Sequence, residues 1–207
     1  MVEAFGPSVE VVVADGGSKD RTVELAEGRA RIVSAPRGRG RQLNEGAQAA
    51  LGDLLVFLHA DTRLSPGAGT ALSEALAQGE IVGGCFKVKL RGPSARLPAA
   101  RALAAAINWR SRRLHTATGD QAIFARRTAF DRVGGYPDDE LFEDVLFYRG
   151  LKRLGPVLVL DLTVSTSDRR WRTFGYTRTI ATHLLLRILF LMGVPPARLA
   201  RLYRRVR

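Results

Sequence analysis

The sequence predicts an α/β protein in which a mainly parallel sheet carries helices on both faces. Short apolar runs alternate with helix-like stretches through the first half of the chain. The runs at 9–14 and 53–61 are continuously apolar, as in strands that are buried on both faces. The 207 residues are 46% hydrophobic and 25% charged, which is enough for one well-packed domain and excludes a disordered chain.

The first half is predicted to follow a strand–helix rhythm. Asp20 is a suitable N-cap for the first helix, and Gly28 and Gly52 are suitable stops for the first two helices. The expected strands are 9–14, 31–35 and 53–61, and the expected helices are 20–30, 40–51 and 67–79.

The second half is predicted to be more mixed. The run 83–90 alternates like a half-exposed strand, and the helix 98–114 is apolar along one side and basic along the other. Further strands are expected at 122–127 and 157–167, and further helices at 128–136, at 141–155 and from 173 onward.

The charge balance favours anionic partners. Lys and Arg number 32 against 20 Asp and Glu, a formal net charge of +12, which suits nucleic acid, an anionic membrane surface or phosphorylated substrates. Aromatic residues are only 7% and lie mostly in apolar runs, which argues against a nucleic-acid-binding face. The single cysteine, Cys85, excludes an intramolecular disulfide and is expected to be a small buried residue.

Two aspartates follow strongly apolar strands. Asp15 and Asp61 each stand at the carboxyl end of such a run, where open sheets bind their ligands. A lone aspartate there is usually a helix cap or turn former, but two on neighbouring strands point to one crevice. Mg²⁺ and Mn²⁺ use one or two protein carboxylates plus substrate phosphates, so Asp61 could hold such an ion together with a diphosphate.

Charged residues elsewhere could complete such a site. Arg37, Arg39 and Arg41 suit phosphate oxygens or are solvated loop charges, and Arg41 opens a helix whose first turn favours anions. Glu143 and Asp144 begin another helix, where one of them could act as a general base on an incoming hydroxyl. The alternative is an ordinary acidic helix start.

Three segments resemble family 2 glycosyltransferases of the GT-A fold, in the same order and over nearly the whole chain. They are "VVVADGGSKDRT", "GRGRQLNEGAQAALGDLLVFLHADT" and "GDQAIFARRTAFDRVGGYPDDELFEDVLFYRGLKRLG". The motifs "HADT", "TGDQ" and "SDRRW" and the ending "MGVPPARLARLYR" resemble in particular a bacterial subfamily associated with arsenosugar biosynthesis.

This resemblance implies roles for particular residues. Asp144 would be the catalytic base of an inverting, metal-assisted transfer from a nucleotide-diphospho-sugar to an acceptor hydroxyl, and Asp61 would hold Mg²⁺ or Mn²⁺. The donor side would comprise Asp15, Gly16, Arg41, His59 and Asp61, and the acceptor or diphosphate side Asp120, Gln121, Glu143, Arg170 and Trp171. The acceptor would be a small molecule or a lipid-linked one.

The sequence departs from the family pattern in two places. His59 stands where the family often has a carboxylate, and could instead be a polar core residue or a turn contact. Family members open with a strand–helix unit before the "DGGS" strand, whereas only eight residues precede that strand here. The alternative hypothesis is therefore an N-terminally truncated, inactive or non-enzymatic member.

The last part of the chain is apolar and then basic. We expect a glycosyltransferase domain over 1–172 and a helical segment over 173–207, whose part 180–207 either contacts an anionic membrane or packs on the domain. The sequence shows no N-terminal signal pattern, and no run reaches the ~18–20 apolar residues of a membrane span. We therefore expect a cytoplasmic protein, with the inner face of the cell membrane as its peripheral site.

Overall fold

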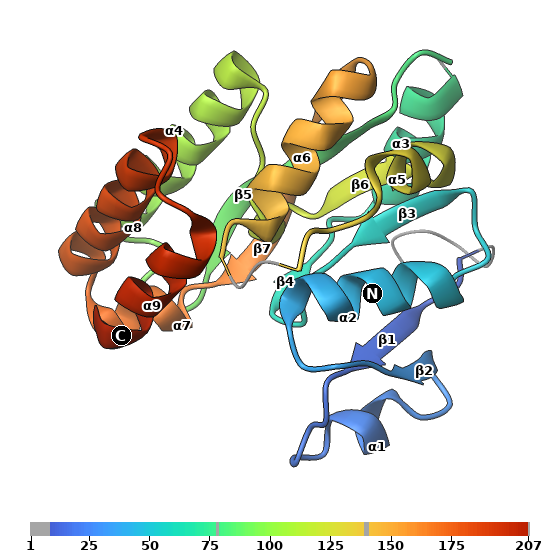
Figure 1. Ribbon diagram of the computed structural model, residues 1–207, viewed down its shortest axis with the longest axis horizontal. Coiled ribbons are helices and arrows are strands. Elements are labelled where there is room, and N and C mark those ends of the chain that lie inside the picture. Colours follow the sequence, from blue (N-terminus) through green and yellow to red (C-terminus); the bar gives the residue numbers. More distant parts are fainter. Residues whose placement is uncertain (1–8, 78, 139–140, 207) are drawn as a thin grey trace.

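The computed structural model describes residues 9–77, 79–138 and 141–206 and is shown in Figure 1. The predicted domain begins at residue 1 and the predicted C-terminal segment ends at residue 207, so both outer limits lie outside the described residues. No helix in these ranges is both long and apolar enough to cross a membrane.

The strands of the described chain form two sheets. A two-stranded parallel sheet pairs β1 (Val12–Asp15) with β2 (Arg31–Ser34). The larger sheet has the order β3 (Leu54–Phe57), β6 (Ile123–Arg126), β5 (Gly83–Arg91), β7 (Val157–Ser167) and β4 (Thr62–Arg63). In this sheet β5 and β7 are parallel, while β3–β6, β5–β6 and β4–β7 are antiparallel.

The sheet is thus mixed, which differs from the mainly parallel sheet expected from the sequence. A continuous apolar run shows that a strand is buried on both faces, but burial does not set its direction. Strand β6 lies between β3 and β5, antiparallel to both, and is as apolar as a central parallel strand. The predicted strand 53–61 shortens to β3, because the chain turns after it, where the main-chain N–H of Thr62 donates to the carbonyl of His59 at 2.9 Å, and the separate strand β4 begins at Thr62.

The helices occur where the periodicity predicts them, with shorter limits in places. They are α1 (Thr22–Ala26), α2 (Arg39–Ala49), α3 (Ala68–Ala77), α4 (Pro98–Leu114), α5 (Arg127–Val133), α6 (Glu143–Leu154), α7 (Arg169–Phe174), α8 (Tyr176–Leu191) and α9 (Pro196–Val206). The boundary predicted between residues 172 and 173 falls inside α7.

Two apolar cores lie on opposite faces of the larger sheet, which confirms that helices cover both faces. Neighbouring residues along a strand point to opposite faces, so Ile123 joins the core with α5 and α6, while Phe124 joins the core with α3. Cys85 is fully buried in the first core, as expected, and burial raises the pKa of its thiol to about 12. Figure 1 shows α6 in the middle of the molecule, with α4 and α8 to its left, α5 and β3 to its right and α2 below it.

Candidate active site

The centre of the candidate site joins the turn after β3, the 3₁₀ turn Gly119–Gln121 and the start of α6. The main-chain N–H of Gly119 donates to Oδ2 of Asp144 at 2.6 Å. A Cβ atom at residue 119 would lie 2.5 Å from Nε2 of His59 and 3.5 Å from Oδ2 of Asp144. A glycine at 119 therefore lets the imidazole pack against the turn that holds the carboxylate.

The backbone before Asp144 is strained. Phe142, the residue that precedes α6, has a φ of 66°, which costs a non-glycine residue on the order of 1–2 kcal/mol. Its ring stacks on Phe190 of α8 with the centroids 4.6 Å apart. This contact joins α8 to the residue just before α6, two residues from Asp144, so the C-terminal helices pack directly against the site.

The electrostatics of the site suit a base. Burial raises the pKa of Asp144, while hydrogen bonds from the N–H groups of Gly119 and Val145 act against that rise. Burial and then the charge of Arg39 lower the pKa of His59, against the pull of the carboxylates of Asp120, Asp144 and Asp61. A carboxylate whose pKa is raised above its ordinary value is a better proton acceptor than an ordinary exposed one.

Glu143 and Arg39 extend the site toward α2. Glu143 is only 3% exposed, and its Oε1 lies 3.8 Å from Nη1 of Arg39. Burial and then the charge of Asp144 raise the pKa of Glu143. From the sequence, Arg39 could be either a solvated loop charge or a phosphate contact. In the structure it lies at the site, close to Glu143.

Asp61 is suited to a divalent ion that also contacts phosphates. Its side chain is exposed on the turn after β3, and within the described ranges its carboxylate accepts no hydrogen bond and forms no ion pair. In the same ranges, no three His, Cys, Asp or Glu side chains meet to form a complete metal site. Mg²⁺ and Mn²⁺ commonly use one or two protein carboxylates together with substrate phosphates, so the residues present fit such an ion.

Asp15 and Gly16 form a separate turn at the end of β1. The carboxylate of Asp15 accepts hydrogen bonds from the N–H groups of Gly17 and Ser18, and the hydroxyl and N–H of Ser18 lower its pKa. The side chain of Gln42 from α2 lies 3.0 Å from a Cβ placed on Gly16. No contact joins Asp15 to Asp61 or Asp144 in the described chain, so the convergence of all three carboxylates stays a prediction.

Arg41 is engaged elsewhere in this structure. Its guanidinium forms two hydrogen bonds of 2.6 Å with the carboxylate of Asp138, in the segment between α5 and α6. A contact of Arg41 with a donor phosphate would have to replace this pair, and that role stays a prediction.

Asp120 and Gln121 differ in their environment. Gln121 has no exposed surface, and its amide bonds to the hydroxyl of Ser111 and the carbonyl of Phe86. Its position is that of a residue that anchors the turn. Asp120 accepts a hydrogen bond of 2.6 Å from the hydroxyl of Thr118 and lies within electrostatic range of His59.

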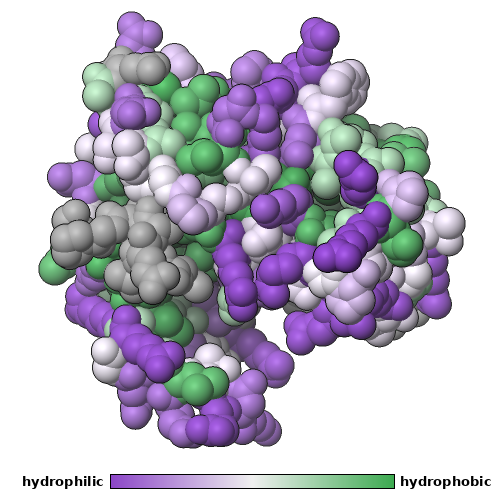
Figure 2. Space-filling model, turned by 180° about the vertical axis from the view of Figure 1, so that it is seen from behind, coloured by the Kyte–Doolittle hydropathy of each residue, from purple (hydrophilic) through white to green (hydrophobic). Residues whose placement is uncertain are grey.

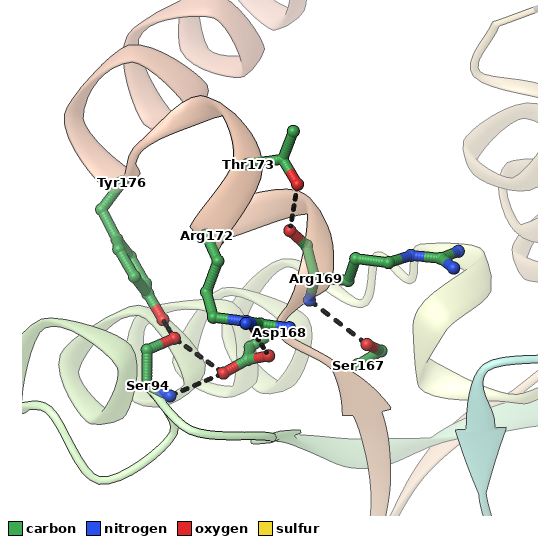
Figure 3. Close-up of polar contacts among 7 residues, drawn as sticks. All are labelled: Ser94, Ser167, Asp168, Arg169, Arg172, Thr173 and Tyr176. Carbon is green, nitrogen blue, oxygen red and sulfur yellow. Dashed lines mark hydrogen bonds and ion pairs between the residues drawn. The ribbon is translucent and has the colours of Figure 1, made fainter.

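The "SDRRW" segment is organised by Asp168, a residue that the sequence analysis did not single out. Figure 3 shows its carboxylate between Ser94 and Arg172, with the Arg169 side chain pointing away. Ser94 donates from its N–H at 2.8 Å and its hydroxyl at 2.7 Å, and Arg172 donates at 3.1 Å. Asp168 is 1% exposed, and it ties the loop before α4 to the start of α7.

Arg170 and Trp171 are placed near α8. The Trp171 ring stacks on Tyr176 at 5.7 Å and meets the edge of His183 at 5.9 Å. Arg170 and Asp120 both act on the pKa of His183, which burial lowers first. Arg170 and Trp171 are therefore linked to the acidic centre indirectly, because both lie near His183, which is within electrostatic range of Asp120.

Two further cations near Asp144 were missed. Arg110 of α4 and Arg187 of α8 both lie within electrostatic range of its carboxylate. The basic side of the helix 98–114 and the lone arginine in an apolar run were the available signals.

Figure 2 shows the molecule notched between the part with α1, β1 and β2 and the part with α7, α8 and α9, with hydrophilic residues along the notch.

Comparison with known proteins decides the family. The family model described as glycosyl transferase family 2 matches residues 2–134, well over half of the chain. The chain belongs to glycosyl transferase family 2. This confirms the predicted enzyme class, a glycosyltransferase. No curated protein gives a significant match.

Solved structures of glycosyltransferases confirm the predicted GT-A fold for this family 2 chain. Glucosyl-3-phosphoglycerate synthase from Mycobacterium tuberculosis, in complex with Mn²⁺, UDP and glucosyl-3-phosphoglycerate, has a TM-score of 0.62 and 24% identity, over 94% of this chain and 74% of that one. The same enzyme with Mn²⁺, UDP-glucose and glycerol 3-phosphate gives 0.60 and 25%, with the same coverage. TarS from S. aureus gives 0.57 and 18%, over 85% of this chain. The chain spans 34% of TarS.

Proposed function

We propose that the protein transfers a sugar from a nucleotide-diphospho-sugar to an acceptor hydroxyl with inversion at the anomeric carbon. The observation that carries this proposal is the placement of Asp144. Its carboxylate is held by Gly119, beside His59 and Asp120, with a pKa that burial raises. In the same turn region Asp61 offers an exposed carboxylate for a metal–diphosphate.

In this mechanism Asp144 takes the proton from the acceptor hydroxyl. The hydroxyl oxygen then forms a bond to the anomeric carbon from the face opposite the diphosphate, and the bond from that carbon to the phosphate oxygen breaks. The products are the glycosylated acceptor and the nucleotide diphosphate. An Mg²⁺ or Mn²⁺ ion held by Asp61 would supply positive charge to the departing diphosphate.

The structural neighbours support this donor class and metal. Glucosyl-3-phosphoglycerate synthase is known in complex with Mn²⁺ and UDP-glucose, at 25% identity to this chain. The resemblance of "HADT", "TGDQ" and "SDRRW" to the subfamily associated with arsenosugar biosynthesis is part of the same proposal. Membership of that subfamily would indicate the kind of acceptor, and the identity of the acceptor stays a prediction.

Calorimetric titration with UDP and Mn²⁺ tests the donor site. We expect UDP to bind only weakly without Mn²⁺, and an Asp61→Ala variant to lose the Mn²⁺-dependent gain. Even outer-shell partners of metal sites contribute about 10–100-fold in affinity, so the loss should be at least that large. Asp53→Ala is the matched control, because Asp53 is an exposed aspartate at the other end of β3. Failure of the natural protein to bind UDP, with or without Mn²⁺, would favour the non-enzymatic alternative.

The C-terminal helices carry the features proposed for contact with an anionic membrane surface. On α8 and just after it, large apolar side chains are strongly exposed, with Leu184 at 57%, Leu191 at 77% and Met192 at 75%. Arg198 and Arg201 of α9 are exposed cations on the neighbouring helix. An apolar surface beside cations suits the headgroup region of anionic lipids, where a lipid-linked acceptor would be found.

Sedimentation with lipid vesicles measures this contact. We expect the protein to sediment with vesicles rich in phosphatidylglycerol, less so at high salt, and not with purely zwitterionic vesicles. Leu191→Gln should weaken the binding. Leu51→Gln is the control, because Leu51 is 82% exposed but lies between α2 and β3. Equal sedimentation of both variants and the natural protein would contradict a contact through α8.

A further inference from the structure

Two arginines approach the candidate base from the side of α4 and α8. Arg110 of α4 lies within electrostatic range of Asp144, Asp120 and Arg187, and Arg187 of α8 also lies within range of Asp144. Figure 1 shows α4 and α8 both on the left of the molecule, whereas α2 and β1 lie below and to the right of α6. The site thus has cations on two sides, since Arg39 reaches Glu143 from α2.

The guanidinium of Arg110 is not satisfied by the protein. Its Nε and Nη2 atoms are buried and have no hydrogen-bond partner in the part of the chain that the structure describes. Burial and then the charge of Arg187 lower its pKa to about 10, and the carboxylates of Asp120 and Asp144 offset this only in part. Buried donors without partners are costly and rare, so Arg110, with the charge of Arg187 beside it, is suited to an anionic ligand.

The anion that these cations would bind could be the donor diphosphate or an anionic group of the acceptor, and the position of the cations distinguishes the two. The predicted donor residues Asp15, Gly16 and Asp61 lie at or after the ends of β1 and β3, on the right of Figure 1, whereas Arg110 and Arg187 belong to α4 and α8 on the left. In an inverting transfer the base activates the acceptor on the face away from the donor diphosphate. We therefore expect an anionic group that is held by α4 and α8 next to Asp144 to belong to the acceptor.

We propose that Arg110 and Arg187 form a subsite for a phosphate or carboxylate group of the acceptor, so that the natural acceptor is an anionic molecule. The inference rests on the proposed function, because it takes Asp144 as the base. A separate groove between α7, α8 and α9 is lined among others by Arg170 and His183, and His183 lies one helical turn before Arg187 on α8.

Binding of glycerol 3-phosphate to the protein saturated with UDP and Mn²⁺ tests the subsite, with glycerol as the neutral probe. Arg110→Met and Arg187→Met remove the charge but keep a similar length, and the Arg110 variant also removes two buried donors that have no partner in the described chain. Arg113→Met is the matched control, since Arg113 is exposed near the end of α4. Melting temperatures verify that all three variants are folded.

The expected result is that glycerol 3-phosphate binds the natural protein and the Arg113 variant, and binds the other two about 10–100-fold more weakly, the size of a lost charge-assisted hydrogen bond. Glycerol should bind none of them measurably, and the affinity for UDP with Mn²⁺ should not change.

Equal affinity for glycerol 3-phosphate in all variants would overturn the subsite. A parallel loss of UDP affinity in the Arg110 and Arg187 variants would assign the anion to the donor diphosphate and also overturn it. If UDP does not bind at all, the proposed donor site fails, and the dependence of phosphate binding on Arg110 is then a separate result.

Discussion

An Asp144→Asn variant is expected to transfer sugar about 10²–10⁴-fold more slowly than the natural protein, which is the usual contribution of a general base. Asparagine cannot take the proton from the acceptor hydroxyl. Its carbonyl oxygen can still accept the 2.6 Å hydrogen bond from the N–H of Gly119, and only the local bond from the N–H of Val145, the next residue, is lost, so the turn and the start of α6 should keep their positions. The measurements are the transfer rate and, separately, the affinity for UDP with Mn²⁺, which should be unchanged.

The control for this variant is Asp131→Asn. Asp131 is an exposed aspartate on α5, and neither its rate of transfer nor its UDP affinity should differ from the natural protein. Full activity of the Asp144 variant would reject the assignment of the base. A loss of UDP affinity as large as the loss of rate would show instead that Asp144 acts in donor binding.

Replacing Asp168 with asparagine is expected to have the largest effect on stability. The carboxylate of Asp168 is 1% exposed and accepts two hydrogen bonds from Ser94 and one from Arg172. The NH₂ group of an asparagine would face the donors of Ser94 or the guanidinium of Arg172, with which it cannot form a hydrogen bond. The loss should be on the order of 3 kcal/mol, because a hydrogen bond to a charged group contributes ~1.5–3 kcal/mol and at least one is lost outright. For a chain of this size that lowers the melting temperature by about 6–12 °C.

Asp161→Asn provides the comparison for that prediction. Asp161 also forms ion pairs, with Lys87 and Arg112, but its side chain is 77% exposed. Exposed pairs typically contribute ~0–1 kcal/mol, so the melting temperature of this variant should change by no more than a few degrees. Equal changes in the two variants would show that burial of the carboxylate is not what makes the Asp168 network important.

The pH dependence of stability follows from the same carboxylate. Burial acts to raise the pKa of Asp168, but the hydrogen bonds from Ser94 and Arg172 outweigh it, so the folded-state pKa lies below the usual range. Such a group stabilises the fold fully above the unfolded-state pKa of about 3.9, and the contribution is lost as the pH falls through the lower folded-state value. The difference in stability between the natural protein and Asp168→Asn should therefore be constant near neutral pH and shrink in acid, as denaturant unfolding at several pH values would show.

The fold was largely predictable because strands and helices are encoded by neighbours along the chain. Apolar runs and their glycine ends placed every predicted strand and helix close to its observed position, including α4 over Pro98–Leu114. The periodicity could not show that β6 runs antiparallel to β3 and β5, because a strand buried on both faces has the same pattern in either direction. Nor could it show that α8 supports the site, because the stacking of Phe142 on Phe190 joins distant segments.

The residues of the site show the same division. From the sequence alone came the family resemblance, the carboxylates Asp61 and Asp144 and the turn glycines, since each belongs to a short motif. Only the tertiary structure decided which partner each charge meets. Arg41 pairs with Asp138 across 97 residues, and Asp168 binds Ser94 across 74. The reason is physical: a motif specifies a local conformation, whereas an ion pair or a buried hydrogen bond depends on which distant segments packing brings within about 3 Å.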